Sequence, residues 1–368
     1  MKLHSLPYHI GSTETPSNPG GLPSTFPFEI RFDPSMPGLV QMPSSDLESI
    51  LKSTYVLGQQ IGTPLAECNA GKPYADDFLK FIHSSVKPTG RALEIGAGVG
   101  YLSRRLKDVG WDVVSIEPGM GYAAHWEKYD ISVVNEFFPS PLARGPFDLI
   151  VAYAVVEHLC DPCDFIQQVR EHLAPNGIAC FSVPNCNEEI ESGDPAILIH
   201  EHVTFFNKSS LKSVITKAGL KANVRESEYG RCLYATAKSQ IGDAKTNLED
   251  DLIEIGKLQS YPDRCIEFIS RAKQNISSFA KLGTIGIYCP IRALALLERD
   301  MSMRFFDDDP KLTGRYLPPF CSKIENRKQL LESPVDTLII MSRTFGSKIR
   351  TSLISQSYSK TVKTINDL

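Results

Sequence analysis

The middle of the chain alternates short apolar runs with segments whose apolar residues recur every three to four positions. Apolar runs of this length predict strands, and the amphipathic segments between them predict helices. The predicted strands are RALEIG (91–96), WDVVSIE (111–117), FDLIVAYA (147–154) and GIACFSVPN (177–185), and the predicted helical stretches are YLSRRLKDVG (101–110) and VEHLCDPCDFIQQVREHLAPNG (156–177). This alternation indicates an α/β protein with a parallel, doubly wound sheet.

A second pattern of the same kind follows near the C-terminus. TIGIYC (284–289), MRFFDDD (303–309) and VDTLIIMS (335–342) predict strands, whereas IRALALLERD (291–300) and FGSKIRTSLISQ (345–356) predict helices. Residues 241–281 read as helices and form a connector. We therefore expect a second, smaller Rossmann-like unit after a helical connector.

The first 45 residues are rich in Pro, Gly, Ser and Thr, a composition that does not build a core unaided. FPFEIRF (26–32) and GLVQM (38–42) look like short strands, a helical pattern starts near Asp46, and the helix FLKFIHSSV (78–86) ends before Pro88. The predicted division is an arm or cap at 1–75, a first sheet-bearing domain at 76–239, the connector at 240–281 and a C-terminal domain at 282–368.

Composition narrows the function classes. The chain has 368 residues, 42% of them hydrophobic and 22% charged, and a net charge of −4, which gives no basic footprint for nucleic acid. The N-terminus lacks the apolar core of a signal peptide, and the most apolar run (283–297) contains Pro290 and Arg292 and is too short for a membrane span. Nine scattered cysteines fit reduced thiols. We expect a cytoplasmic protein without nucleic-acid or membrane partners.

The glycine turn after the first predicted strand carries the first chemical signal. It reads Glu94-Ile95-Gly96-Ala97-Gly98-Val99-Gly100, one residue tighter than the G-x-G-x-x-G turn of nicotinamide dinucleotide sites. A carboxylate at a strand end suits a cofactor that carries an ammonium and a sulfonium. Glu117 ends the second predicted strand, where an acid can bind the two hydroxyls of a ribose.

These motifs, with SIEP (115–118) and FDLIVAYAVVEHLCDP (147–162), resemble the class I S-adenosylmethionine-dependent methyltransferases over residues 76–235. The resemblance implies that the glycine turn passes under the methionine part of S-adenosylmethionine and that the turn after 147–154 lines its adenine and methyl side. Glu136 could face the adenine or be a solvated loop acid, and Glu157 and His158 are expected to open a helix and pack locally. The implied cofactor-binding residues are Glu94, Gly96, Ala97, Gly98, Gly100, Glu117, Glu136 and Tyr153.

A His-Glu-His run at 200–202, in HEHVTFFN, precedes the predicted helix 209–220. In an extended segment His200 and His202 point one way and Glu201 the other, and either histidine could act as a general base. Two histidines two positions apart without an evident third ligand do not supply the ligand set of zinc, so we expect no metal ion here.

The run also resembles a stretch of the sugar C-methyltransferases, which act on nucleotide-linked keto-sugars. Residues 305–342, with K-x-x-G-x-Y-L-P inside them, are similar to the C-terminal Rossmann-like domain of that family, which helps enclose the sugar nucleotide. The resemblance implies removal of a proton beside a ketone and attack of the enolate on the sulfonium methyl. His202 is then the base or its partner, and Glu201 and His200 orient it or bind substrate. The alternative is that the run only hydrogen-bonds a loop to the sheet.

The sequence departs from that family in three places. The N-terminal zinc module of paired Cys-x-x-Cys motifs is absent, since the first 67 residues contain no cysteine and CDPC (160–163) reads as two ordinary thiols. The tyrosine before the run is Ile199, so a catalytic phenol would have to come from Tyr55 or Tyr74. Residues 288–292 stand where that family has a small, lysine-bearing turn. Arg292 in this segment could hold a phosphate or be solvated.

The run Asp307–Asp309 is expected to cap a turn rather than to bind a metal. The substrate also stays open at this point. O- or N-methylation of another small metabolite and a non-catalytic cofactor-binding scaffold are the alternatives to sugar C-methylation, and the tightened glycine turn argues against a nicotinamide oxidoreductase.

Overall fold

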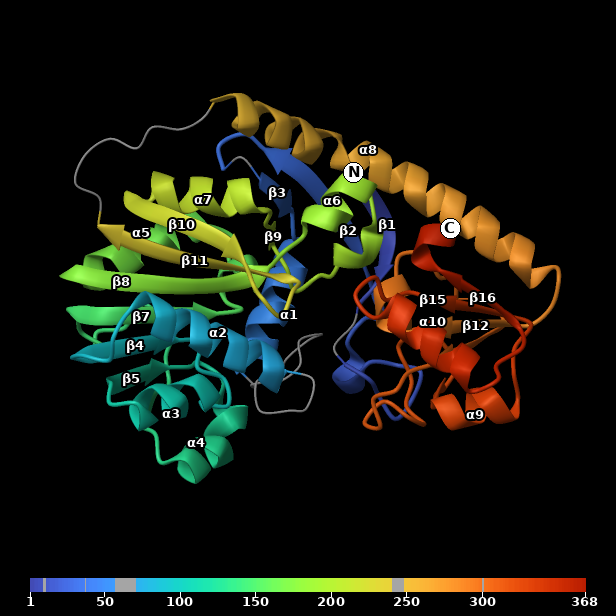
Figure 1. Ribbon diagram of the computed structural model, residues 1–368, viewed down its shortest axis with the longest axis horizontal. Helices are drawn as coiled ribbons and strands as arrows, with labels where there is room; N and C mark the ends of the chain where they lie inside the picture. Colours follow the sequence, from blue (N-terminus) through green and yellow to red (C-terminus); the bar gives the residue numbers. More distant parts are fainter. Residues whose placement is uncertain (9–10, 37, 57–70, 240–247, 300) are drawn as a thin grey trace. The chain divides into compact units, whose positions relative to one another are not determined.

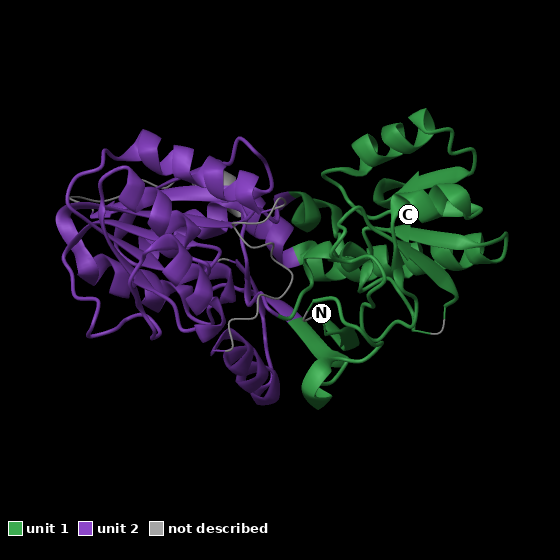
Figure 2. Ribbon diagram, turned by 90° about the horizontal axis from the view of Figure 1, so that it is seen from below, with its two compact units in different colours: residues 1–29, 188–200, 260–368 green, residues 30–187, 201–259 purple. Residues whose placement is uncertain are grey.

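A computed structural model describes the chain except for residues 9–10, 37, 57–70, 240–247 and 300. By internal contacts the chain forms two compact units (Figure 2). Unit 1 comprises residues 1–29, 188–200 and 260–368, and unit 2 comprises residues 30–187 and 201–259. This grouping does not follow chain order, and the four-part domain division stays a prediction.

Unit 2 is built on a seven-stranded sheet in the order β10-β11-β8-β7-β4-β5-β6 (Figure 1). The strands from β8 to β6 are parallel, and β11 pairs antiparallel with both β8 and β10. The strands are β4 Arg91–Ile95, β5 Asp112–Ile116, β6 Val133–Val134, β7 Phe147–Tyr153, β8 Leu173–Pro184, β10 Leu220–Glu226 and β11 Cys232–Ser239. The sequence placed the strands β4, β5 and β7 and the apolar part of β8 within a few residues of these bounds.

Helices cover both faces of this sheet because its central strands are apolar on both sides. One core gathers Leu93, Ile150 and Phe181 with α5 and α7, and the other gathers Ala92, Leu149 and α2, α3 and α4. The helices are α1 Ser45–Val56, α2 Lys72–Ser85, α3 Tyr101–Asp108, α4 Ala123–Tyr129, α5 Pro162–His172 and α7 Lys208–Lys217. The parallel strands therefore have carboxyl ends that open at one edge of the sheet, where α/β proteins bind ligands.

Unit 2 also contains the two short strands β3 (Gly38–Gln41) and β9 (Thr204–Phe205), which do not belong to the seven-stranded sheet. The second half of β2 (Thr25–Asp33) pairs antiparallel with β3, and β3 pairs with β9. The β3 backbone is tied to the segment before β9 because the Gln41 N–H donates to the Val203 carbonyl at 2.7 Å. The first half of β2 pairs with β1 (Lys2–Pro7) within unit 1.

Unit 1 carries a smaller, five-stranded parallel sheet in the order β14-β13-β12-β15-β16. Its strands are β12 Ile285–Tyr288, β13 Met303–Phe306, β14 Ile324–Glu325, β15 Thr337–Ile340 and β16 Thr361–Thr364, and the helices that lie wholly or partly in unit 1 are α6 Asn187–Ser192, α8 Leu248–Ala280, α9 Arg327–Glu332 and α10 Gly346–Ser355. The expected α/β fold with two parallel-rich sheets is confirmed.

One predicted helix is wrong. Residues 291–299 of the predicted helix IRALALLERD (291–300) do not form an α-helix; a 3-10 turn at Pro290–Ala293 takes its place, and residue 300 lies outside the described residues. Cys289 precedes it in the left-handed region at φ 60°, and the apolar Leu294, Leu296 and Leu297 are buried in the turns that follow. Tertiary burial of those leucines overrides the helical propensity that the sequence pattern indicated.

No helix of the described residues is long and apolar enough to cross a membrane.

Candidate active site

The glycine turn follows β4 at the carboxyl edge of the larger sheet. The backbone N–H groups of Gly96 and Ala97 donate to the Ile116 carbonyl at 2.9 and 3.0 Å, which fixes the turn against the end of β5. Gly96 has φ 73°, and a Cβ atom there would lie 2.6 Å from Cγ2 of Val155. Only glycine fits this position, because both the backbone conformation and the space exclude a side chain.

Glu94 lies beneath the turn, on β4. Its side chain is buried, and the hydroxyl of Ser103 on α3 donates to the carboxyl. Burial raises the pKa of Glu94 to about 8. The described residues place no lysine, arginine or histidine within ion-pair distance of this carboxyl.

Glu117 follows β5 and is held by two backbone donors. Its Oε2 accepts from the Gly98 N–H at 2.8 Å and its Oε1 from the Gly119 N–H at 2.7 Å. Burial raises the pKa of Glu117, and the two hydrogen bonds oppose that rise. Like Glu94, it has no cationic side chain within ion-pair distance among the described residues.

Both carboxyls line one cavity of about 840 Å³ inside unit 2. Of the residues predicted to bind the cofactor, Glu94, Gly96, Ala97, Gly98, Glu117 and Tyr153 line it, whereas Gly100 and Glu136 do not. Glu136 is exposed and accepts a hydrogen bond from Ser140. Gly100 begins α3 at φ 78°, with Ile131 where its Cβ would be, so it shapes the turn rather than the cavity wall.

The wall of the cavity is acidic and apolar. Glu48, Glu94, Glu117 and Glu201 line it, and Lys52 is the one lysine or arginine among the described lining residues. Much of the rest is apolar, including Leu51, Val99, Ile116, Phe138, Val155 and Phe165. Two buried carboxylates without cationic partners fit a ligand that brings an ammonium, a sulfonium and ribose hydroxyls. They do not fit the pyrophosphate of a dinucleotide, which needs backbone or cationic donors.

The His-Glu-His run does not have the extended geometry expected from its spacing. The chain turns at His200 and Glu201, so the alternation of a strand does not apply and the prediction that both histidines share a side is wrong. His200 is buried in unit 1 among the rings of Tyr8, Phe26 and Phe28. Burial lowers its pKa to about 4. Glu201 and His202 belong to unit 2, and Glu201 lines the cavity.

Tyr55 and His158 complete the wall near Glu201. The hydroxyl of Tyr55, on α1, lies 3.1 Å from Nδ1 of His158, and the same nitrogen lies 2.9 Å from the Glu201 carbonyl oxygen. Because a carbonyl oxygen only accepts, this contact assigns the proton of the neutral imidazole to Nδ1. Burial lowers the pKa of His158 to about 4, so the ring is neutral near pH 7.

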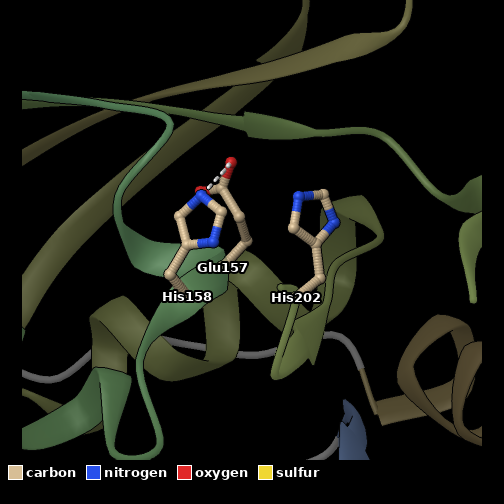
Figure 3. Close-up of side chains that lie close together, drawn as sticks. All are labelled: Glu157, His158 and His202. Carbon is tan, nitrogen blue, oxygen red and sulfur yellow. Dashed lines mark ion pairs between the residues drawn. The ribbon is translucent and has the colours of Figure 1, made fainter. Parts of the chain in front are cut away.

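His202 and Glu157 lie close to His158 (Figure 3). The rings of His158 and His202 have centroids 5.0 Å apart at 71°, and Nε2 of His158 lies 3.9 Å from Oε1 of Glu157. Neither His202 nor Glu157 lines the cavity. The sequence singled out His202 and assigned His158 only to local packing, whereas the structure places His158 in the cavity wall.

Tyr122 is a second lining residue that the sequence did not single out. Burial is the main cause of its raised pKa, and the charges of Glu117 and Glu201 add to it, so both carboxylates lie near this phenol. It follows SIEP in a 3-10 turn (Met120–Tyr122), and no sequence pattern marks it beyond its distance from Glu117. Tyr122 thus lines the same cavity as Glu117 and Glu201.

The aspartates of unit 1 cap turns, as expected. Oδ1 of Asp307 accepts from the Asp309 N–H and Oδ1 of Asp309 from the Lys311 N–H, both at 2.9 Å. Asp308 pairs with Arg327 and accepts from the Tyr288 hydroxyl at 2.5 Å. Arg292 is exposed, and its predicted phosphate contact stays a prediction.

Residues 70–225 match the family model described as a methyltransferase domain. A ubiquinone biosynthesis O-methyltransferase of Bradyrhizobium diazoefficiens is 33% identical over 107 residues, which is 26% of this chain and 41% of that protein. A probable S-adenosylmethionine-dependent methyltransferase of Mycolicibacterium smegmatis is 28% identical over 133 residues, 35% of this chain and 51% of that protein. The matches thus span about half the length of these relatives. A solved complex of DhpI with SAM and HEP aligns over 54% of this chain and all of its own, at 20% identity and a TM-score of 0.42.

Proposed function

We propose, from the premise that residues 70–225 form a methyltransferase domain of the class I S-adenosylmethionine-dependent family, that this chain methylates a small molecule. The observation that carries the proposal is that one cavity of unit 2, of about 840 Å³, brings two groups of residues together. Its wall contains both the buried acids Glu94 and Glu117 at the glycine turn and the polar group of Tyr55, His158 and Glu201. One site can therefore hold a methyl donor and handle the proton of an acceptor.

The glycine-turn side would hold the cofactor. Glu94 lies under the turn where an ammonium can neutralise it, and Glu117, already oriented by two backbone N–H groups, can accept from ribose hydroxyls. Tyr153 and the apolar side chains beside it would form the wall against which the adenine of the cofactor packs. S-adenosylmethionine, when bound, supplies a methyl group on a positively charged sulfur that a nucleophile can attack.

The acceptor side would be formed by Tyr55 and Glu201. With the proton of His158 on Nδ1, the Glu201 carbonyl and the Tyr55 oxygen share that one N–H, and the Tyr55 hydroxyl can donate to an acceptor's carbonyl oxygen. Such a donor stabilises the negative charge that develops on that oxygen when a neighbouring C–H loses its proton. The Glu201 carboxylate can take up that proton. In this proposal Tyr55 supplies the phenol that a tyrosine at the position of Ile199 supplies in the sugar C-methyltransferases.

His202 is assigned a positioning role. Its ring centroid lies 5.0 Å from that of His158, which lines the cavity, and Figure 3 shows the two rings side by side. His200, packed among aromatic rings of unit 1, holds the turn that presents Glu201. Both residues then act through others, as partners rather than as the base itself.

The acceptor class that we propose first is a nucleotide-linked keto-sugar methylated at carbon. It rests on the resemblance of the His-Glu-His run and of residues 305–342 to the sugar C-methyltransferases, and on a wall that pairs a phenol donor with a carboxylate. Lys52, on α1, is the cation of this wall that an anionic acceptor would meet.

The second candidate is O-methylation of a small hydroxyl compound. The names of the relatives, ubiquinone biosynthesis O-methyltransferases among them, favour it. The same carboxylate would then accept the proton of a hydroxyl, and Tyr55 would orient the acceptor oxygen.

Deuterium exchange separates the two candidates. The protein is incubated in D₂O with keto-sugar nucleotides and with hydroxylated aromatic compounds, once with S-adenosylhomocysteine to measure carbon-bound exchange and once with S-adenosylmethionine to measure methyl transfer. The acceptors of both incubations are analysed by mass spectrometry. Exchange of one carbon-bound proton that requires Glu201 supports C-methylation. Methyl transfer to an acceptor without any carbon-bound exchange favours O-methylation. Failure of both acceptor classes to gain a methyl group overturns the proposal for these classes.

A further inference from the structure

Glu157 is a buried acid that the proposed reaction does not use. Its side chain is 2% exposed, and its Oε2 has no hydrogen-bond partner among the described residues. A carboxylate in this position is costly unless a cation or a donor balances it. The nearest ionisable partner given by the structure is His158, with Nε2 3.9 Å from Oε1 of Glu157.

Two imidazoles share this buried place with Glu157. One ligand-capable atom of each of Glu157, His158 and His202 can be chosen so that all three lie within 4.8 Å of one another. Figure 3 shows the carboxyl group beside the His158 ring, with the His202 ring facing it. The two segments that supply these residues are joined by a backbone hydrogen bond from the Val203 N–H to the Glu157 carbonyl, at 2.8 Å.

The imidazole of His158 is oriented as a ligand. Its Nδ1 lies 2.9 Å from the Glu201 carbonyl oxygen, the contact of the tautomer with its proton on Nδ1; in that tautomer the lone pair lies on Nε2, 3.9 Å from Oε1 of Glu157. Metal-binding histidines typically donate their second ring nitrogen to a carbonyl or carboxylate in this way, which fixes tautomer and ring direction.

We propose that Glu157, His158 and His202 bind a divalent ion of the zinc type in unit 2. Two imidazole nitrogens and one carboxylate oxygen are the three protein ligands of many zinc sites that keep a fourth position for water. Tetrahedral binding needs ligand atoms roughly 3.4 Å apart, and the three chosen atoms lie within 4.8 Å of one another, so side-chain rotation would have to bring them closer. The ion would neutralise Glu157 and hold the His158 tautomer that orients Tyr55.

This site consists of a carboxylate and two imidazoles, and so differs from the paired-cysteine zinc module of the sugar C-methyltransferases. Its ligands His158 and His202 also have roles in the proposed function, but metal binding can be measured without any methyl acceptor, so the two proposals can fail separately. The sequence did not predict it, since His200 and His202 offered no third ligand. The ligands instead come from His202 and from Glu157 and His158, more than forty residues earlier in the chain.

Cobalt titration tests the site. The full chain is stripped with a chelator and titrated with Co²⁺ while absorbance between about 500 and 650 nm is recorded, where tetrahedral Co²⁺ absorbs intensely; Zn²⁺ is then added as a competitor. We expect one equivalent of Co²⁺, displaced by Zn²⁺. Glu157→Gln and His202→Gln should each weaken binding at least about tenfold. His83→Gln, on the exposed side of α2, is the matched control and should bind as the parent does.

Three results overturn the site: no stoichiometric Co²⁺ in the parent protein, binding undiminished in both variants, or thiolate charge-transfer bands that show cysteine ligands. Retained S-adenosylhomocysteine affinity shows that a variant is folded. If both variants fail to fold, X-ray absorption of the zinc-loaded parent decides, because the site requires two imidazoles in the metal's coordination shell. A shell without them rejects the proposal, whereas failure of methyl transfer alone leaves the metal result unchanged.

Discussion

The hydroxyl of Tyr55 lies 3.1 Å from Nδ1 of His158, although 103 residues separate them in the chain. Tyr55 is on the short helix α1 and His158 is in the turn after β7, so the contact forms only when α1 covers the carboxyl edge of the sheet. This pair supplies the cavity with a phenol next to Glu201, and it is the basis of the proposed acceptor chemistry.

Tyr55→Phe should lower the rate of methyl transfer by about 10²-fold, because the donor to the acceptor oxygen is lost while the ring stays in place. Its affinity for S-adenosylhomocysteine, measured by calorimetry, should stay within about twofold of the parent value. Tyr74→Phe is the matched control, since Tyr74 does not line the cavity. A loss of activity in Tyr74→Phe and not in Tyr55→Phe would contradict the proposal and assign the phenol to Tyr74.

Glu117→Gln should weaken the binding of S-adenosylhomocysteine by roughly 10- to 100-fold, the range for hydrogen bonds to a charged group. The amide retains the shape but offers only one acceptor oxygen, and that oxygen can satisfy only one of the Gly98 and Gly119 N–H groups. Glu136→Gln, at an exposed acid outside the cavity, should change the affinity little. Equal losses in both variants would mean that the effect does not come from the cavity.

Cofactor affinity should rise with pH between about 6 and 7.5 through Glu94. Burial raises the pKa of this carboxyl to about 8, so in the free protein it is largely protonated in this window. A cationic ligand favours the charged form, binding releases a proton, and affinity therefore increases by up to about tenfold per pH unit. Calorimetry in buffers of different ionisation enthalpy measures the released proton. In Glu94→Gln both the slope and the proton release should vanish, and a slope that persists in this variant would assign the effect to another group.

Gly96→Ala should destabilise the protein by about 1–3 kcal/mol and abolish tight cofactor binding, since the new Cβ would lie 2.6 Å from Val155 at a positive φ. Gly110→Ala tests the contribution of backbone conformation alone, because Gly110 has φ 104° and nothing within 4 Å of its Cβ position. Urea denaturation of both variants should show the larger loss in free energy of unfolding for Gly96→Ala. A smaller loss at position 96 would indicate that the turn relaxes.

Much of the fold was predictable because local patterns decide it. Strand β4, the tightened glycine turn and Glu117 at the end of β5 could be identified from sequence alone, since apolar runs and glycine spacing are properties of neighbouring residues. The part of the cavity wall that the glycine turn forms, Gly96, Ala97 and Gly98, could be predicted for the same reason.

The remainder depends on tertiary structure. The alternation rule failed at His200–His202 because the chain turns there, and no spacing reveals that His200 enters an aromatic cluster while Glu201 lines the cavity. IRALALLERD looks helical, but its leucines are buried in turns. Tyr55 meets His158, and Glu157 and His158 meet His202, only in the folded chain, because these residues come from segments far apart in the sequence.

Titration of the full chain with S-adenosylhomocysteine, with NADH measured in parallel, tests the central claim most directly. The account predicts micromolar, 1:1 binding of S-adenosylhomocysteine and no detectable heat from NADH, because the cavity offers two buried acids and no seat for a pyrophosphate. Binding of NADH without S-adenosylhomocysteine, or of neither ligand, would contradict it.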